Sequence, residues 1–214
     1  MTSFSKSKMN NEDIITSIEM LEKVYGQSPE GAIKKEISYI SDHYRAFIEA
    51  APFVIIATVG PEGLDCSPRG DPAGFVRVVD NHTVIIPDRR GNNRVDSLRN
   101  IVRDKRISLL FLIPGIGETI RINGTAKIST NPELCSTFAL QNKNPTSVII
   151  ISLGSIYYQC PKALVRSKLW DRESIVTREK LPTTGNILEA ITKGKINGDD
   201  YDKAYPKRIK DTIY

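Results

Sequence analysis

The chain has 214 residues, 40% of them hydrophobic, and a formal net charge of +5 with a pI of about 9.0. This length and composition fit one globular domain with a full hydrophobic core and exclude a chain that is disordered throughout. No apolar run is long enough to cross a bilayer, and residues 1–14 lack the apolar stretch of a secretory signal, so we expect a cytoplasmic protein.

The amino terminus is rich in helix signals. We expect residues 1–10 to be disordered and residues 11–51 to form three helices that pack on the domain that follows. Apolar side chains at helical spacing from Ile14 to Val24 predict the first helix. The signals that end or begin the helices are Gly26, Ser28-Pro29, Ser41-Asp42 and Pro52. The third helix should turn Tyr44, Phe47 and Ile48 inward.

From residue 52 the hydrophobic period becomes that of strands. Strands are predicted at 53–59, 64–69, 74–79, 83–87, 107–113, 118–129 and 146–160. Helices are expected from about Arg94, with Val95, Leu98, Ile101 and Val102 on one face, and from Asn131 to Gln141. The regular strand–helix alternation of a parallel sheet is missing, which favours an antiparallel barrel decorated with helices. Residues 171–214 are expected to form a packing arm with a helix near Asn186–Thr192.

Metal and nucleic-acid sites have little support. Cys66, Cys135 and Cys160 are odd in number and far apart, so they indicate neither a disulfide framework nor a metal site, and we interpret them as small buried side chains. The basic residues occur singly rather than in long runs. This spacing favours compact anion sites over a nucleic-acid track, although the net charge keeps nucleic-acid binding as a remote alternative.

The strongest chemical signal is the turn that precedes the helix near Arg94. A strand ends at Pro87-Asp88, Arg89-Arg90-Gly91 turn the chain, and Asn92 and Asn93 are good N-cap residues. Helix starts have unpaired N–H groups and a positive dipole end, so neighbouring arginines would complete a phosphate site. No Walker or dinucleotide glycine pattern is present. A solvated helix cap with no ligand is the alternative.

A second signal lies in the segment SPRGDP. Ser67 and Arg69 are two residues apart on a predicted strand and therefore point to the same face. Two prolines and a glycine then end the strand. The alternative is a strand that passes into a loop and carries a surface arginine.

Together, the elements SPRGDP, IPDRRGN, DSLRNI and FLIPG, in this order, resemble the FMN-binding split-barrel family related to pyridoxamine 5′-phosphate oxidase. The likeness spans roughly residues 40–170 and is greatest with the small flavoproteins of that family. It implies a mainly β fold, a six-stranded antiparallel split β-barrel over residues 52–170, with N-terminal helices and the arm 171–214. It also implies a homodimer with FMN in the groove between subunits.

The resemblance also implies which residues hold the cofactor. Arg69, with Ser67 beside it, and the helix start at Asn93-Arg94 would bind the phosphate. The oxidase of this family has an Arg-Lys pair at this start, so Arg89 or Arg90 is expected to supply the missing cation. The residues implied around the ring, ribityl chain or subunit interface are Pro87, Asp88, Arg89, Thr119, Lys162, Arg166 and Trp170. A plain core role is the alternative for Trp170.

The leading hypothesis is therefore an FMN-dependent oxidoreductase acting on a small molecule, with NADH or NADPH as a candidate electron donor. No carboxylate pair and no nucleophile with a base suggests hydrolase chemistry. The alternatives are a non-catalytic flavin- or haem-binding or redox-sensing protein on the same barrel, and a deazaflavin-dependent reductase. The oxidase's substrate-binding region is not recognisable in residues 171–214, which argues against vitamin B6 oxidation.

Overall fold

The computed structural model describes residues 13–214. The chain divides into two compact units, Met1–Lys35 and Glu36–Tyr214. The expected disordered residues 1–10 lie outside the described part. In the first unit, α1 (Ile18–Tyr25) begins after the cap Ser17 and ends at Gly26, and α2 (Glu30–Lys34) follows Pro29. The end of α1 at Gly26 and the start of α2 after Pro29 agree with the sequence signals. The start of α1 does not, because the helix begins after Ile14 and Ile15.

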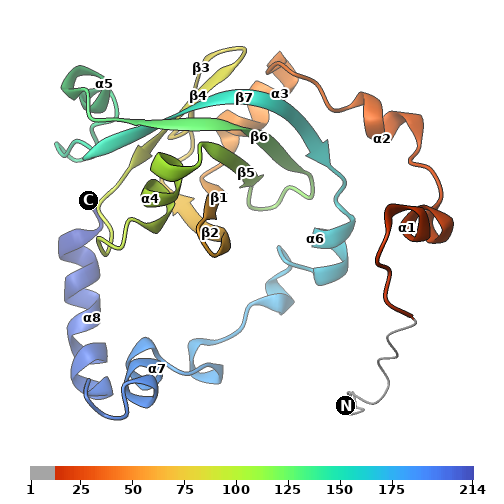
Figure 1. The fold of residues 1–214 in the computed structure, drawn as a ribbon. Helices are drawn as coiled ribbons and strands as arrows, with labels where there is room; N and C mark the ends of the chain where they lie inside the picture. Colours follow the sequence, from red (N-terminus) through yellow and green to blue (C-terminus); the bar gives the residue numbers. More distant parts are fainter. Residues whose placement is uncertain (1–12) are drawn as a thin grey trace. The chain divides into compact units, whose positions relative to one another are not determined.

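The second unit is built on one antiparallel sheet with the strand order β2-β1-β5-β6-β7-β4-β3 (Figure 1). The sheet has seven strands, which corrects the expected six. The strands are β1 (Phe53–Gly60), β2 (Gly63–Gly70), β3 (Arg77–Asp80), β4 (Thr83–Asp88), β5 (Arg106–Leu112), β6 (Thr119–Ser129) and β7 (Ser147–Gln159).

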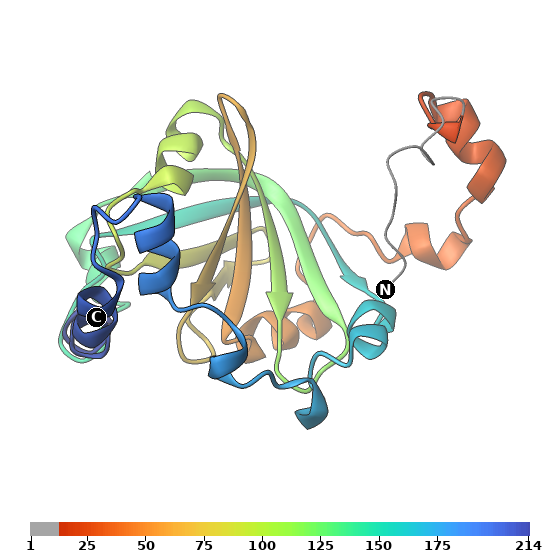
Figure 2. The same cartoon turned by 90° about the horizontal axis from the view of Figure 1, so that it is seen from below.

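The sheet curls into a split β-barrel, and its core lies inside the curl (Figure 2). β2 lies at one edge and β4 next to the other, yet Arg69 and Asp88 at their ends come within 3.9 Å. Alternate residues of β1 are buried, as a strand with one face inward requires. The core includes fully buried Val54, Ile56, Phe111 and Ile122. Each such side chain contributes roughly 1.5–3 kcal/mol through removal from water.

Two helices cover the barrel. α3 (Asp42–Ala50) packs against β3 and β6, buries Ile48 completely, and directs Tyr44 and Phe47 to the core as predicted. α4 (Asp96–Arg103) packs against β1, β2 and β6. Ile101 is buried beneath it, whereas Val102 is 76% exposed, so the expectation that Val102 shares the inward face was wrong.

The remaining helices follow β6 and β7. α5 (Pro132–Ser136) is capped by Asn131 as predicted but ends before Gln141. The elements after β7 are α6 (Lys162–Ser167), η3 (Arg172–Ser174), η4 (Arg178–Lys180), α7 (Thr184–Ile191) and α8 (Gly198–Thr212). α8 was not predicted, because Pro206 within it normally breaks a helix. No helix in residues 13–214 has the length and apolar character needed to cross a membrane.

The cysteine prediction was only partly right. Cys135 is buried in a small cluster with Ile85, Phe138 and Val148. Cys66 is exposed because it lies on the outer face of β2, and Cys160 is exposed because it directly follows the end of β7.

Candidate functional site

Two adjoining cavities lie where the ends of β2 and β4 meet the start of α4. Their volumes are about 490 and 530 Å³, within the usual range for small-molecule sites. Both are lined by Arg89, Arg90, Asn93, Thr146 and Tyr214. The first cavity continues over Arg69, Asp88 and the α4 start, and the second over the loop that contains Lys143.

Arg69 and Asp88 form one wall of the first cavity. Arg69 lies on the half-buried face of β2 together with Ser67, which confirms that these two side chains share a face. The Arg69 Nη2 atom is 3.9 Å from Asp88 Oδ1, and the two side chains are 24% and 17% exposed. Burial raises the pKa of Asp88 above its ordinary value of 3.8, and the nearby Arg69 charge offsets only part of that rise. The two side chains are therefore poorly solvated, and the distance between their charged groups is long for an ion pair.

Arg89 and Arg90 are adjacent in sequence but have different surroundings. Arg89 Nε donates to Asp71 Oδ2 at 2.7 Å, and Nη1 donates to the carbonyl of Phe138 at 2.8 Å. The Asp71 side chain is only 2% exposed, so Arg89 neutralises a buried carboxylate. Arg90 is exposed, lines both cavities and has no ion pair with any residue the structure describes. Its guanidinium is available to an anion.

The helix start differs from the sequence prediction. α4 begins at Asp96, and its N-cap is Val95, not Asn92 or Asn93. Asn93 and Val95 both have left-handed backbone, with φ of 60° and 52°. Because no side chain caps the helix, its first N–H groups remain available beside Val95 and Leu98, which line the first cavity. A β-branched residue at positive φ is strained, and such strain concentrates at binding sites.

Arg94 is exposed and pairs with Asp96. Its Nε donates to Asp96 at 2.8 Å, and the Arg94 side chain is 75% exposed. Arg94 is not among the residues that line either cavity. Of the sequence-predicted phosphate ligands, Arg69 and Asn93 are thus brought together, whereas Ser67 and Arg94 lie outside the cavity walls.

Tyr214 belongs to the site but was not predicted from the sequence. Its hydroxyl donates to Asp71 Oδ1 at 3.0 Å, and Lys143 Nζ donates to its carbonyl at 2.7 Å. Its pKa is raised above 10.0 by burial first, then by the hydrogen bond and charge of Asp71, with Arg89 opposing. Tyr214 is far from the other site residues in sequence, and no local pattern near it indicates a ligand.

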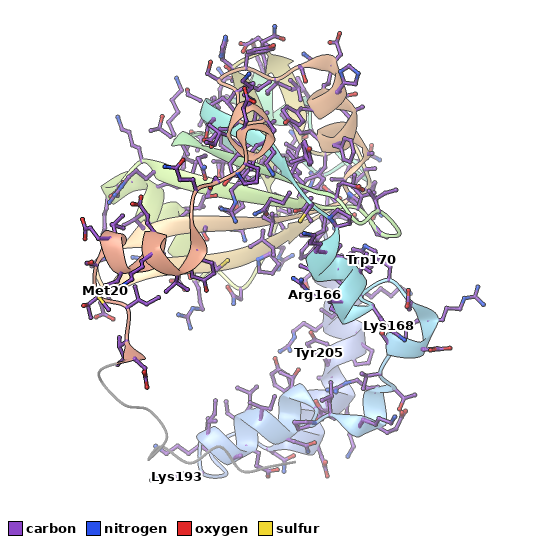
Figure 3. All side chains as sticks on the ribbon, turned by 90° about the vertical axis from the view of Figure 1, so that its right-hand side faces the viewer. Met20, Arg166, Lys168, Trp170, Lys193 and Tyr205 are labelled. Atoms are coloured by element: carbon purple, nitrogen blue, oxygen red, sulfur yellow. The ribbon has the colours of Figure 1, made fainter. Side chains whose placement is uncertain are left out.

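The other expected residues lie at a different end of the barrel. Thr119 is buried and pairs with Gln159, the last residue of β7. The first residue of β7, Ser147, lines the first cavity, so Thr119 and the cavity lie at the two ends of this strand. A strand of 13 residues spans roughly 40 Å. Lys162 and Arg166 lie on α6, and Figure 3 places Arg166 and Trp170 where the chain leaves the sheet. Trp170 Nε1 donates to the carbonyl of Ile116 at 2.8 Å.

The cavity walls are suited to a ligand that joins an anionic group to an apolar body. Arg69, Arg90 and the uncapped α4 start supply positive charge and N–H donors. Apolar surface on the same cavity comes from Phe75, Pro87, Val95 and Leu98. A flavin mononucleotide has both parts, a phosphate and an aromatic ring system with an apolar dimethylbenzene edge, so the residues present fit it.

Comparison with known proteins agrees with the resemblance in the sequence. The sequence model of the family described as pyridoxamine 5′-phosphate oxidase matches residues 40–160, more than half of the chain. No curated protein matches the chain.

Solved structures with a similar fold share little sequence. HupZ of Group A Streptococcus is 21% identical over 56% of this chain and 94% of its own, with a TM-score of 0.46. A protein related to general stress protein 26 from Clostridium acetobutylicum is 11% identical over 55% of this chain and 86% of its own, with a TM-score of 0.42. A structure named F420 reductase is 14% identical over 56% of this chain and 98% of its own, with a TM-score of 0.40. Likenesses of this size bear on neither cofactor nor substrate.

Proposed function

Because the chain belongs to the pyridoxamine 5′-phosphate oxidase family, we propose that it binds FMN and acts as an FMN-dependent oxidoreductase on a small molecule. The observation that carries this proposal is the cavity of about 490 Å³ that joins Arg69, Arg90 and the uncapped start of α4. Five of the residues that the sequence resemblance implies line this cavity: Arg69, Pro87, Asp88, Arg89 and Asn93.

The residues of this cavity divide into two roles. Arg69, Arg90 and the first N–H groups of α4 would hold the phosphate, because charge-assisted hydrogen bonds to a phosphate are strong. Phe75, Pro87 and Leu98 would contact the apolar part of the ring and exclude water from it. When bound, the flavin supplies the electron-transfer chemistry, and the polypeptide supplies binding, orientation and the local electrostatics.

Arg89 has a supporting role in this proposal. Its bonds to buried Asp71 and to the carbonyl of Phe138 hold the loop that carries Arg90 against the segments that follow β2 and α5. Either Arg89 or Arg90 was expected to supply a cation to the phosphate. Because Arg89 is paired with Asp71, we propose Arg90 as the phosphate ligand.

We further propose that the working form is a homodimer with the cofactor at the subunit interface. Thr119, Lys162, Arg166 and Trp170 lie near one end of β7, whereas the cavity lies at the other (Figures 1 and 3). One copy of the chain therefore does not bring both groups to the same FMN. A two-fold partner could supply the second group, as isologous interfaces do.

The test begins with the visible spectrum of the purified chain, before and after addition of FMN and then NADPH. We expect flavin absorption bands, an FMN-dependent rise in melting temperature, and bleaching by NADPH. Arg69→Ala and Arg90→Ala should weaken FMN binding by about 1.5–3 kcal/mol each, the value of a hydrogen bond to a charged group. Arg103→Ala, on exposed α4 surface outside the two cavities, is the control.

The alternatives give different results in the same experiment. FMN binding without reduction by NADH or NADPH would favour a carrier or redox sensor. An intense Soret band on titration would favour haem, and stronger competition by a deazaflavin would favour that cofactor. No spectral change and no thermal shift with any of them would refute the proposal.

A further inference from the structure

α7 and α8 form a helical hairpin, residues 183–214, that meets the barrel at the candidate site. The two helices pack on each other, and Gly185 N donates to Asp202 Oδ1 at 2.8 Å. From η3 to the start of the hairpin, residues 171–182 are exposed. The far end of α8 returns to the barrel beside the start of β7, on the side away from α6 (Figures 1 and 2).

Tyr214 makes two hydrogen bonds that join this hairpin to the barrel. Its hydroxyl donates to Asp71 Oδ1, and its carbonyl accepts from Lys143 Nζ, at 3.0 and 2.7 Å. The Arg89 guanidinium lies 5.8 Å from the centre of the Tyr214 ring. Asp71 therefore accepts from Arg89 with one oxygen and from Tyr214 with the other.

The docked tyrosine leaves room for a ligand. Tyr214 lines both cavities, and volumes of about 490 and 530 Å³ remain with Tyr214 in place. Spaces of this size hold small ligands and cofactors. Tyr214 thus forms a wall of the site instead of filling it, and a ligand held by Arg90 would lie next to that wall.

We propose that Tyr214 is a ligand-contacting residue and that it closes the α7–α8 hairpin over the occupied site. The inference rests on the proposed function for the identity of the ligand as FMN. Because the contact is made only when the hairpin is docked, ligand binding and docking stabilise each other. Such coupling is reciprocal: docking strengthens ligand binding by the factor by which the ligand strengthens docking.

The experiment compares Tyr214→Ala and Tyr214→Phe with the wild-type chain. Tyr205→Ala is the control, because Tyr205 lies on α8, the helix that precedes Tyr214, and contacts only Tyr201 and Arg208 among the ring contacts described there. One readout is hydrogen–deuterium exchange of residues 183–214, with and without FMN. The other is the rate at which bound FMN is released on dilution, followed by the recovery of flavin fluorescence.

In the wild type, FMN should slow exchange in the hairpin. Tyr214→Ala should exchange faster without FMN, show no slowing with it, and release FMN about tenfold faster, the effect of one lost contact of ordinary strength. Tyr214→Phe, which keeps the ring but loses the bond to Asp71, should fall between the two. Tyr205→Ala should release FMN at the wild-type rate.

Two negative results are distinguishable. If the wild type binds FMN and Tyr214→Ala releases it at the wild-type rate, the ligand contact is refuted and the proposed function stands, whatever the exchange of the hairpin. If the wild type binds no FMN, the proposed function is refuted and the ligand contact with it.

Discussion

Arg69 on β2 and Asp88 on β4 face each other across the split of the barrel, with 3.9 Å between Nη2 and Oδ1. Their strands are not neighbours in the sheet, so this pair marks the place where the two sides of the barrel approach. Burial raises the pKa of Asp88 despite the nearby arginine. The structure therefore places a costly negative charge in a cavity otherwise suited to an anion.

This cost predicts a pH dependence for Asp88→Asn. The pKa of Asp88 is higher in the folded state than the unfolded value of 3.8. Its contribution to stability is therefore complete below pH 3.8 and is lost as the pH rises through the folded-state pKa. We expect the unfolding free energy of Asp88→Asn, relative to wild type, to increase as pH rises from below 3.8 towards 7. Denaturant unfolding at several pH values measures this difference.

Asp104→Asn is the control for that series. The hydrogen bonds from Arg106 lower the pKa of Asp104 to about 2, so this charge favours the folded state above pH 3.8 and loses its effect as pH falls through about 2. The relative stability of Asp104→Asn should therefore change with pH in the opposite direction. Equal slopes for the two variants would contradict the assignment.

The strained backbone at Val95 predicts a stabilising substitution. Asparagine tolerates the left-handed region better than a β-branched residue, so Val95→Asn should raise the unfolding free energy by about 1 kcal/mol. Val102→Asn is the matched control, because Val102 is exposed within α4 and the two residue types have similar helix propensities. A thermal or denaturant unfolding curve decides the matter, and a loss of stability in Val95→Asn would show that the strain is absent.

Arg89→Ala and Arg90→Ala should separate stability from binding. Arg89→Ala leaves the buried Asp71 carboxylate without its cation and should cost about 3–5 kcal/mol of stability. Arg90→Ala, at an exposed position, should change stability by less than about 0.5 kcal/mol. Paired unfolding curves and FMN titrations give the two quantities. Equal stability losses would argue against the different roles of the two arginines.

The close approach of α7 and α8 predicts that Gly185→Ala opens the hairpin. A Cβ atom at residue 185 would lie 2.6 Å from the Asp202 carboxyl and closer still to the backbone of Gly198. We expect faster proteolysis within residues 183–214 and little change in the barrel. Gly31→Ala, where a Cβ meets nothing within 4 Å, should leave the cleavage pattern unchanged.

Local patterns in the sequence determined much of this protein. Alternating apolar residues predicted the strands, because a strand with one buried face repeats every two residues. The caps Ser41 and Asn131 were also predicted from short motifs and are confirmed. The order of four short elements was sufficient to identify the family. Local patterns were weaker at the start of α4, where Asn93 and Val95 have positive φ and the helix begins at Asp96 rather than near Arg94.

Only the tertiary structure decided which charged side chains share a cavity. Arg89 and Arg90 are neighbours in sequence and look equivalent. In the structure, Arg89 pairs with the buried carboxylate of Asp71, whereas Arg90 is exposed to solvent. Tyr214 belongs to the site although it is 143 residues from Asp71 in the sequence. Thr119 and α6, which were expected at the site, lie away from it. Sequence specifies the local conformation that each segment prefers, but the partners of a charge depend on contacts between residues far apart in the chain.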